Sequence, residues 1–285
     1  MAYETARLLI TCPDGRGIIA AVAGFLAEHG GNILEADQHT DPQHGEFFMR
    51  VEIELDGFGL DRATFDEAWG CVAARFGMRW HVHWGNVTKR MVILVSKESH
   101  CLNDLLWRWK TGELNVDIPF VAGNHLALQD EAEAMGIPFH HLPVTPENHA
   151  GQEARLLSLI ADGRADFIVL ARYMRVLSPS FVARFPERIV NIHHSFLPAF
   201  AGPRPYHHAY ERGVKIIGAT SHYVTDELDQ GPIIAQSTLP VDHRDTVDDL
   251  IRKGRDLERV VLAAAVRLHV EDKILVSQNK TIVFD

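Results

Sequence analysis

The spacing of apolar side chains changes near residue 90 and divides the sequence into two patterns. Before that point, two stretches of helical periodicity stand among runs in which apolar and polar residues alternate, as they do in half-buried strands. In the run 46–55, for example, Phe47, Met49 and Val51 share one face. The pattern predicts strands at 7–11, 32–39, 46–55 and 78–84 and helices at 18–29 and 61–76. This order is βαββαβ, the ferredoxin-like arrangement.

From Arg90 onward, compact apolar runs alternate with stretches of helical periodicity. Such alternation predicts a doubly wound α/β domain with a mostly parallel sheet. The run 166–171 is apolar after its first residue, as expected of a central parallel strand buried on both faces. The predicted strands are 91–95, 116–121, 139–144, 166–171, 189–193, 214–224 and 233–241, the helices are 101–109, 126–135, 146–162 and 246–270, and a hairpin ends the chain at 274–284.

Three residues refine these boundaries. Pro119 places its strand near an edge or an end of the sheet, because proline cannot donate a hydrogen bond to a neighbouring strand. Pro146 is expected to begin the helix that follows it, and Asp245 is the candidate N-cap of the last helix. We therefore predict an α/β protein with a ferredoxin-like domain at 1–84, a linker at 85–89 and a doubly wound domain at 90–285.

Composition and charge narrow the class of partner. The chain has 285 residues, of which 46% are apolar, and this is enough for a sizeable core. A formal charge of -10 argues against nucleic acid as a partner, and no apolar run is long enough to span a membrane. The first residues carry no signal-peptide pattern. Cys12, Cys71 and Cys101 are widely spaced and are expected to be free thiols in a reducing cytoplasm.

The most informative polar cluster begins with Asn191 and His193, directly after the apolar run 188–190. Alternate side chains of a strand share a face, so these two are expected to project to the same side. Taken alone, such a pair more often belongs to a turn, here the one that leads to Pro198. However, open α/β sheets bind their ligands at the carboxyl ends of buried strands. The pair is therefore a candidate for chemistry.

A second polar cluster lies downstream, where Asp229 occupies a loop between two apolar strands. A single carboxylate on a loop is usually only solvated. Together with Asn191 and His193, however, the carboxylate of Asp229 suits chemistry at a carbonyl carbon. Histidine can polarise or protonate the oxygen, asparagine can stabilise an oxyanion, and aspartate can position and deprotonate a nucleophile.

These clusters carry a resemblance to a known family. The segment 191–198, followed by Phe200 and Gly202, resembles the active-site strand of folate-dependent formyltransferases. The segments 222–233 and 170–178 resemble their second motif and their folate-pocket segment. The first domain resembles the ACT domain, a small regulatory module that often binds amino acids. This combination, with His193-His194 where transferases commonly have His-Pro, resembles the formyltetrahydrofolate deformylases.

That resemblance implies hydrolysis of 10-formyltetrahydrofolate to tetrahydrofolate and formate, which supplies formate for purine biosynthesis and balances the one-carbon folate pool. It implies that Asn191, His193 and Asp229 are catalytic. It places five further residues at the substrate: Met174, Arg175, Leu177, His194 and Gly231. From the residues alone, Met174 and Leu177 also fit an ordinary core, and Arg175 fits a surface or strand-end ion pair. Tyr206 is expected to pack or hydrogen-bond near the entrance for the folate tail.

One departure from the transferases favours a hydrolase. Glycinamide ribonucleotide formyltransferases have a glycine-rich loop after the first strand of this domain, and its backbone N–H groups hold the phosphate of the acceptor. The corresponding segment here, 96–103, contains no glycine, and Glu98 would repel a phosphate. Water is therefore the expected acceptor. Two alternatives remain, a formyltransferase with a non-phosphorylated acceptor and a catalytically silent folate sensor.

No metal or other cofactor is expected. The chain contains 17 histidines, which raises the alternative of a zinc hydrolase. It has no H-E-x-x-H motif, and neighbouring histidines such as His193 and His194 cannot easily both face one ion from a strand.

The likeness to ACT domains also implies an amino-acid effector. Its predicted site contains Asp14 and Gly17 before the first helix and Asn32 and Ile33 after it, because backbone N–H groups at a helix start suit a carboxylate. A glycine or methionine effector would make regulatory sense. A plain turn, or packing in a dimer without a ligand, is the alternative. A homodimer or homotetramer is expected for such a module.

Overall fold

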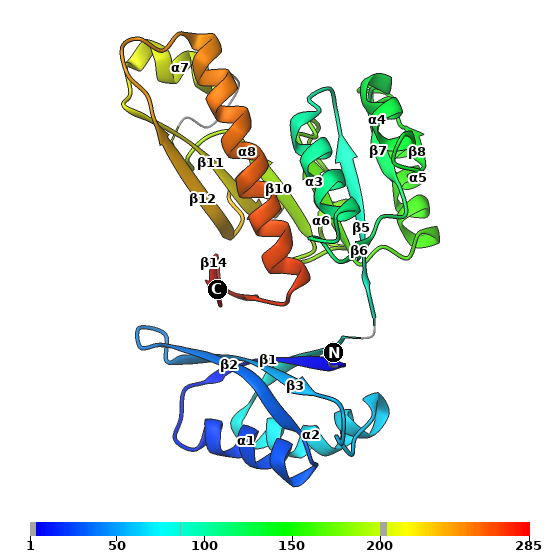
Figure 1. Ribbon diagram of the computed structural model, residues 1–285, viewed down its shortest axis with the longest axis vertical. Coiled ribbons are helices and arrows are strands. Elements are labelled where there is room, and N and C mark those ends of the chain that lie inside the picture. Colours follow the sequence, from blue (N-terminus) through cyan, green and yellow to red (C-terminus); the bar gives the residue numbers. More distant parts are fainter. Residues whose placement is uncertain (1–3, 86, 200–203) are drawn as a thin grey trace. The chain divides into compact units, whose positions relative to one another are not determined.

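The computed structural model describes residues 4–85, 87–199 and 204–285. Their contacts divide the chain into two units (Figure 1). One unit runs to Thr88 and also contains Glu271–Ser277 and Ile282–Asp285, and the other contains Lys89–Val270 and Gln278–Thr281. Most of the C-terminal stretch thus groups with the first unit, although the sequence pattern assigned it to the second. A short amphipathic strand has the same alternation whichever unit it joins, so the pattern could not reveal this.

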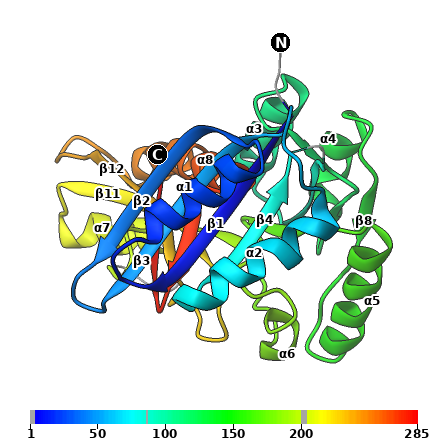
Figure 2. The ribbon, with the colours of Figure 1, turned by 90° about the horizontal axis from the view of Figure 1, so that it is seen from below.

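The first unit is a four-stranded antiparallel sheet of order β2-β3-β1-β4, with two helices on one face (Figures 1 and 2). This confirms the predicted βαββαβ order. The elements are β1 (Thr5–Pro13), α1 (Ile18–Glu28), β2 (Asn32–Asp41), β3 (Glu46–Glu54), α2 (Arg62–Phe76) and β4 (Arg79–Trp84).

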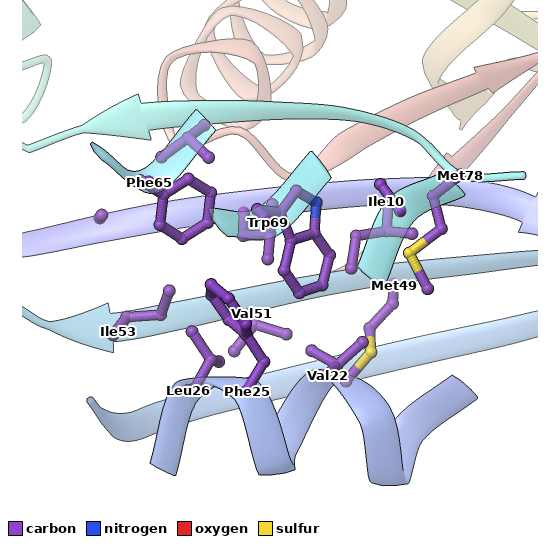
Figure 3. Packing of buried hydrophobic residues seen from close by; sticks show 14 of the residues in the cluster. Ile10, Val22, Phe25, Leu26, Met49, Val51, Ile53, Phe65, Trp69 and Met78 are labelled. Carbon is purple, nitrogen blue, oxygen red and sulfur yellow. The ribbon is translucent and has the colours of Figure 1, made fainter. Parts of the chain in front are cut away.

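An aromatic cluster fills the core between this sheet and its helices (Figure 3). The rings of Phe65 and Trp69, on successive turns of α2, are stacked with centroids 6.0 Å apart. Phe25 of α1 meets Trp69 edge-on at 5.0 Å. The start of α2 is fixed by a capping box, in which Asp61 accepts from the backbone of Thr64 and the hydroxyl of Thr64 accepts from the backbone of Asp61. Packing and capping together set the position of α2 on the sheet.

The second unit contains an eight-stranded sheet with the order β12-β11-β10-β9-β5-β7-β8, and β6 pairs with β5 off this path. Its pairs are parallel except for β10–β11 and β11–β12, which confirms a mostly parallel sheet. The strands are β5 (Lys89–Val95), β6 (Val116–Asp117), β7 (Val121–Gly123), β8 (Phe139–His141), β9 (Phe167–Ala171), β10 (Ile189–His193), β11 (Ile216–Tyr223) and β12 (Ile233–Pro240). The helices are α3 (His100–Lys110), η1 (Leu126–Leu128), α4 (Gln129–Glu133), α5 (His149–Asp162), α6 (Pro179–Val182), α7 (Pro205–Arg212) and α8 (Val247–Val270). A short hairpin of β13 (Ile274–Ser277) and β14 (Lys280–Val283) ends the chain.

Helices cover both faces of this sheet. Leu156 and Ile160 of α5 and Phe181 of α6 join a core cluster with Val92 and Ile168 of the central strands. On the other face, α8 contacts β10, β11 and β12 and packs beside α3 (Figure 1). The strand order reverses between β5 and β9, which places a crevice at the carboxyl ends of these strands. Among the helices of the described residues, none combines the length and apolarity needed to cross a membrane.

Several predicted boundaries were wrong for local reasons. The strand predicted at 116–121 is interrupted, because Pro119 has no N–H, and it appears as the short strands β6 and β7. The helix predicted from Pro146 begins only at His149. Before it, the side chain of Asn148 accepts from the backbone N–H of Thr145 and stabilises a turn instead.

The long helix α8 has a different cap from the one predicted. The hydroxyl of Thr246 accepts from the backbone N–H of Asp249, and the Asp249 carboxylate accepts from the backbone N–H of Thr246. The carboxylate of the candidate cap Asp245 instead forms an ion pair with the ammonium of Lys253 at 2.7 Å. Thr246 is therefore the N-cap, because its hydroxyl and not the preceding carboxylate reaches the free N–H groups of the first turn.

Candidate active site

The structure brings Asn191, His193 and Asp229 together at the carboxyl ends of the central strands. Asn191 and His193 come from β10, and Asp229 comes from the loop between β11 and β12. Nδ1 of His193 lies 3.3 Å from Oδ1 of Asp229. The amide of Asn191 lies 3.1 Å from Nε2 of His222, whose position opposite Asn191 follows from the antiparallel pairing of β10 with β11.

His222, which begins the second motif, belongs to this site, although it was not among the predicted site residues. Its side chain is buried, and Nε2 also lies 3.7 Å from Oδ1 of Asp229. Its Nδ1 faces the carbonyl oxygen of Tyr223 at 2.9 Å and must therefore carry a proton. In the neutral ring Nε2 is then an acceptor for the Asn191 amide N–H, which fixes the orientation of that amide. His222 is recognised as part of the site by its position across from Asn191, and that position depends on the strand register.

The protonation state of Asp229 follows from its two histidine neighbours. The contact with His193, and then the contact with His222, lowers the pKa of Asp229 well below its usual range, although burial opposes this. Asp229 is therefore ionised at neutral pH. Because His193 donates to Asp229 through Nδ1, its other ring nitrogen is left for a substrate. Within the described residues, this buried Nε2 has no hydrogen-bond partner, which is costly unless a ligand supplies one.

These side chains line a cavity of about 340 Å³, together with the loop that follows β9. Met174, Arg175, Leu177 and His194, which the resemblance places at the substrate, all contribute to its wall. Met174 is 57% exposed, so it is not part of an ordinary core, whereas Leu177 belongs both to the wall and to the core cluster.

The loop after β9 is held at both ends by side chains from neighbouring elements. The backbone N–H of Met174 donates to the hydroxyl of Ser96 at 2.9 Å. Further along, the backbone N–H of Ser178 donates to the carboxylate of Glu153 on α5 at 2.7 Å. Such anchoring keeps the cavity wall in place before a ligand arrives.

Comparison with known proteins shows which family the chain belongs to. Residues 89–266 match the formyl transferase family, and residues 6–62 match the ACT domain. The formyltetrahydrofolate deformylase of Synechocystis sp. is 53% identical over 284 residues, with 100% of each chain covered. The chain belongs to the formyltetrahydrofolate deformylase family.

Solved structures agree with this assignment. The crystal structure of a formyltetrahydrofolate deformylase from Pseudomonas syringae is similar over 100% of this chain and 96% of that chain, with a TM-score of 0.98 and 48% identity. A glycinamide ribonucleotide transformylase from Symbiobacterium toebii has a TM-score of 0.65 and 30% identity, and it covers 70% of this chain and 95% of that chain. The chain thus combines a formyl transferase domain with an ACT domain. The match to the transformylase covers 70% of the chain, whereas the match to the deformylase covers all of it.

Gly231 does not line the cavity, although the sequence suggested a contact with substrate. A Cβ atom at this position would lie 1.8 Å from the carbonyl oxygen of Tyr223. The glycine therefore allows the ends of β11 and β12 to approach and so shapes the loop that carries Asp229. Phe200 and Gly202, which belong to the first motif, lie outside the described residues.

The predicted effector residues do not form one site within a single chain. Asp14 and Gly17 lie before α1, where Gly17 is the N-cap with a φ of 90°. Asn32 and Ile33 begin β2, after the other end of the helix, and Asn32 donates to Glu54. The 11 residues of α1 separate the two pairs by about 16 Å at 1.5 Å per residue. A single small ligand cannot contact both pairs in one subunit.

One cluster of the described residues has metal-ligand types at suitable distances, namely His100, Cys101 and Glu258. Burial raises the pKa of the Cys101 thiol well above its usual value, so this group is not a thiolate. The carboxylate of Glu258 already accepts hydrogen bonds from His100 and Tyr206. Nε of Arg172 lies 3.3 Å from the same carboxylate. A neighbouring guanidinium makes this a poor place for a cation. Tyr206, expected to pack or hydrogen-bond near the entrance for the folate tail, is buried and donates to Glu258.

Proposed function

We infer that the chain is a formyltetrahydrofolate deformylase, a hydrolase that converts 10-formyltetrahydrofolate and water to tetrahydrofolate and formate. The observation that carries this inference is the arrangement of Asn191, His193 and the ionised Asp229 around one cavity. Amide, imidazole and carboxylate are the groups that addition of water to a carbonyl carbon requires. The deformylases named above support it over the whole length of the chain.

The geometry supports the following order of events. A water molecule held by Asp229 attacks the formyl carbon, and the proton that it loses passes to the carboxylate. The oxyanion that forms is stabilised by the amide of Asn191 and by Nε2–H of His193 in the imidazolium form, in which both ring nitrogens donate; this Nε2 has no partner within the described protein. The bond from carbon to nitrogen then breaks, and the nitrogen of tetrahydrofolate leaves with the proton that Asp229 took from the water. A single oxyanion donor typically contributes about 3 kcal/mol to such a transition state.

The loop after β5 supports water as the acceptor. The carboxylate of Glu98 pairs with the guanidinium of Arg255 at 2.8 Å, so a negative group lies next to the start of α3. Ser96 is committed to the substrate loop through Met174. Neither arrangement suits an acceptor phosphate, which needs exposed backbone N–H groups without a neighbouring carboxylate.

The proposed reaction needs no metal, because every proton and charge in it is assigned to a side chain. Purified protein should therefore release formate and tetrahydrofolate in equal amounts from 10-formyltetrahydrofolate, without an amine acceptor and with a chelator present. Loss of this activity on chelation, with recovery on adding Zn²⁺, would contradict metal independence. No formate under any condition, with folate still bound, would contradict hydrolysis and favour a formyltransferase with a non-phosphorylated acceptor.

We further propose that the ACT domain binds an amino acid between two subunits of a homodimer or homotetramer. This would bring the helix start of one subunit, with Asp14 and Gly17, to the strand start of another, with Asn32 and Ile33, which one subunit alone keeps apart. Glycine and methionine are the effectors to test by calorimetry, with Asn32→Ala as the variant. We expect saturable binding that Asn32→Ala weakens, with one ligand per pair of facing sites. A monomeric protein would contradict the proposal.

We also place this hydrolysis in the cytoplasm, where it would supply formate for purine biosynthesis and balance the one-carbon folate pool. The three cysteines, Cys12, Cys71 and Cys101, are free thiols. Such thiols are typical of a reducing compartment.

A further inference from the structure

A buried carboxylate lies in the middle of α8, and the mechanism above does not use it. Glu258 is 1% exposed. Its Oε2 accepts a hydrogen bond from Nε2 of His100 at 2.7 Å, and its Oε1 accepts one from the hydroxyl of Tyr206 at 2.6 Å. Nε of Arg172 lies 3.3 Å from Oε2. Burial acts to raise the pKa of Glu258, but the contacts with His100, Arg172 and Tyr206 outweigh it and the pKa is lowered. The carboxylate is therefore ionised at neutral pH.

The fold is adapted to bring these groups together. Arg172, directly after β9, has a φ of 60°, a conformation that residues other than glycine seldom adopt. Gly254 lies one turn before Glu258, and a Cβ atom there would lie 2.0 Å from the hydroxyl of Tyr206. A buried ion pair generally adds little net stability compared with apolar packing. These adaptations therefore point to a role in the reaction.

Arg172 connects Glu258 to the substrate cavity. Its Nη1 contacts Nδ1 of His194. The ring of His194 is stacked on that of His193, with centroids 5.0 Å apart, and both histidines line the cavity. A guanidinium has donors and no acceptor, so the nitrogen that faces it must accept. The proton of a neutral His194 is then at Nε2, and a second proton at Nδ1 would set two positive charges against each other.

We propose that Glu258 and Arg172 hold His194 as a neutral imidazole with its proton at Nε2. His194 then serves the reaction as a hydrogen-bond donor to the water or the formyl oxygen, and the base that takes the proton of the water remains Asp229. Glu258 is a positioning residue, because it acts through Arg172. The part that concerns catalysis rests on the proposed hydrolysis, whereas the state of the His194 ring does not.

The other ionisable groups near His194 favour the same state. The ring of Tyr206 lies 6.3 Å from that of His194, and burial together with the neighbouring Glu258 raises the pKa of this phenol, which stays neutral. His193 donates a hydrogen bond from Nδ1 to Asp229 and, as an imidazolium, stabilises the oxyanion through Nε2–H. A charged His194 stacked on it would repel any positive charge that His193 gains. His100 contacts Glu258 and helps to hold that carboxylate in place.

The state of the ring can be measured directly by ¹⁵N NMR of the histidine side chains in the full-length protein, with His194 assigned from the spectrum of His194→Gln. We expect the Nε2–H tautomer for His194, and protonation of its ring only at a lower pH than an ordinary histidine requires. A proton at Nδ1, or ordinary titration of this ring, would overturn the proposal. This measurement needs no active-site variant and no enzymatic activity.

Glu258→Gln then tests the positioning role, because it keeps the size of the side chain and removes its charge. Because Arg172 loses its anchor, we expect His194 to show a mixture of its two neutral tautomers, and kcat to fall about 10- to 100-fold, as is typical when a supporting partner is lost, with KM for the folate close to that of the wild type. Asp256→Asn is the matched control, since this carboxylate lies on the same helix, is exposed and pairs with Arg259 at the surface.

A folded Glu258→Gln with the same His194 tautomer and the same kcat as Asp256→Asn would also overturn the proposal. If Glu258→Gln does not fold, the spectrum of the wild type still decides the state of His194. Absence of formate release by the wild type would contradict the proposed hydrolysis and leave the tautomer result untouched.

Discussion

Asp229→Asn should lower kcat for formate release by about 10³-fold or more and leave KM for the folate nearly unchanged. Asparagine keeps the size of the side chain, but it cannot take the proton of the water, and general bases of this kind contribute about 10² to 10⁴ in rate. It also removes the negative charge that faces His193 at 3.3 Å, which weakens the donor to the oxyanion. Steady-state kinetics of formate release, together with folate binding by fluorescence, would measure both effects.

The loss in Asp229→Asn should be similar at about pH 6 and about pH 8, because the ordinary pKa of aspartate is about 3.9 and the contacts with His193 and His222 lower it further. A group with a lowered pKa in the folded state gives its stabilisation above its unfolded pKa and loses it only as the pH falls through the folded value. Glu227→Gln, on the same loop but not in the cavity wall, is the matched control. Near-native turnover of Asp229→Asn would exclude Asp229 as the base.

Trp69→Ala should destabilise the first unit by about 3 to 5 kcal/mol, the usual cost of removing a large buried aromatic side chain. Trp69 is fully buried, and it lies between Phe65 and Phe25 in the aromatic cluster (Figure 3). The cavity left behind cannot be filled by either ring without loss of their mutual contact. Denaturant unfolding followed by circular dichroism would measure the difference.

Trp107→Ala provides the comparison for this experiment, since that tryptophan is 57% exposed on α3. It should change the free energy of unfolding by less than about 1 kcal/mol, as is usual for surface positions. Equal destabilisation by the two substitutions would show that the aromatic cluster does not hold the first unit together.

The sequence predicted most of the fold because its signals are local. The alternation of Phe47, Met49 and Val51 on β3, and the helical spacing of Val22 and Phe25 on α1, need only short stretches of chain to be recognised. The short helices α6 and α7 were not predicted, because four and eight residues are too few to show a period. The interrupted strand around Pro119 shows how one missing N–H overrides an apolar run.

The candidate site was predictable in part for the same reason. Asn191 and His193 are two residues apart on one strand, and Asp229 shortly precedes the turn residues Gly231 and Pro232. The network behind them was not predictable. Glu258 lies in a charged stretch of α8 beside Asp256 and Arg259, which reads as a solvated helix face. Its burial depends on Gly254 and Tyr206, and their meeting is a matter of tertiary packing alone.

The division of the chain into its two units has a consequence for modular exchange. The first unit is not a simple N-terminal attachment, because it also takes in Glu271–Ser277 and Ile282–Asp285 from the other end of the chain. A cut in the segment near Thr88 would leave the two units joined through Val270 and Glu271. To transplant the first unit onto another enzyme, both pieces of chain would have to be carried along, so a fusion of the N-terminal residues alone would transfer an incomplete unit.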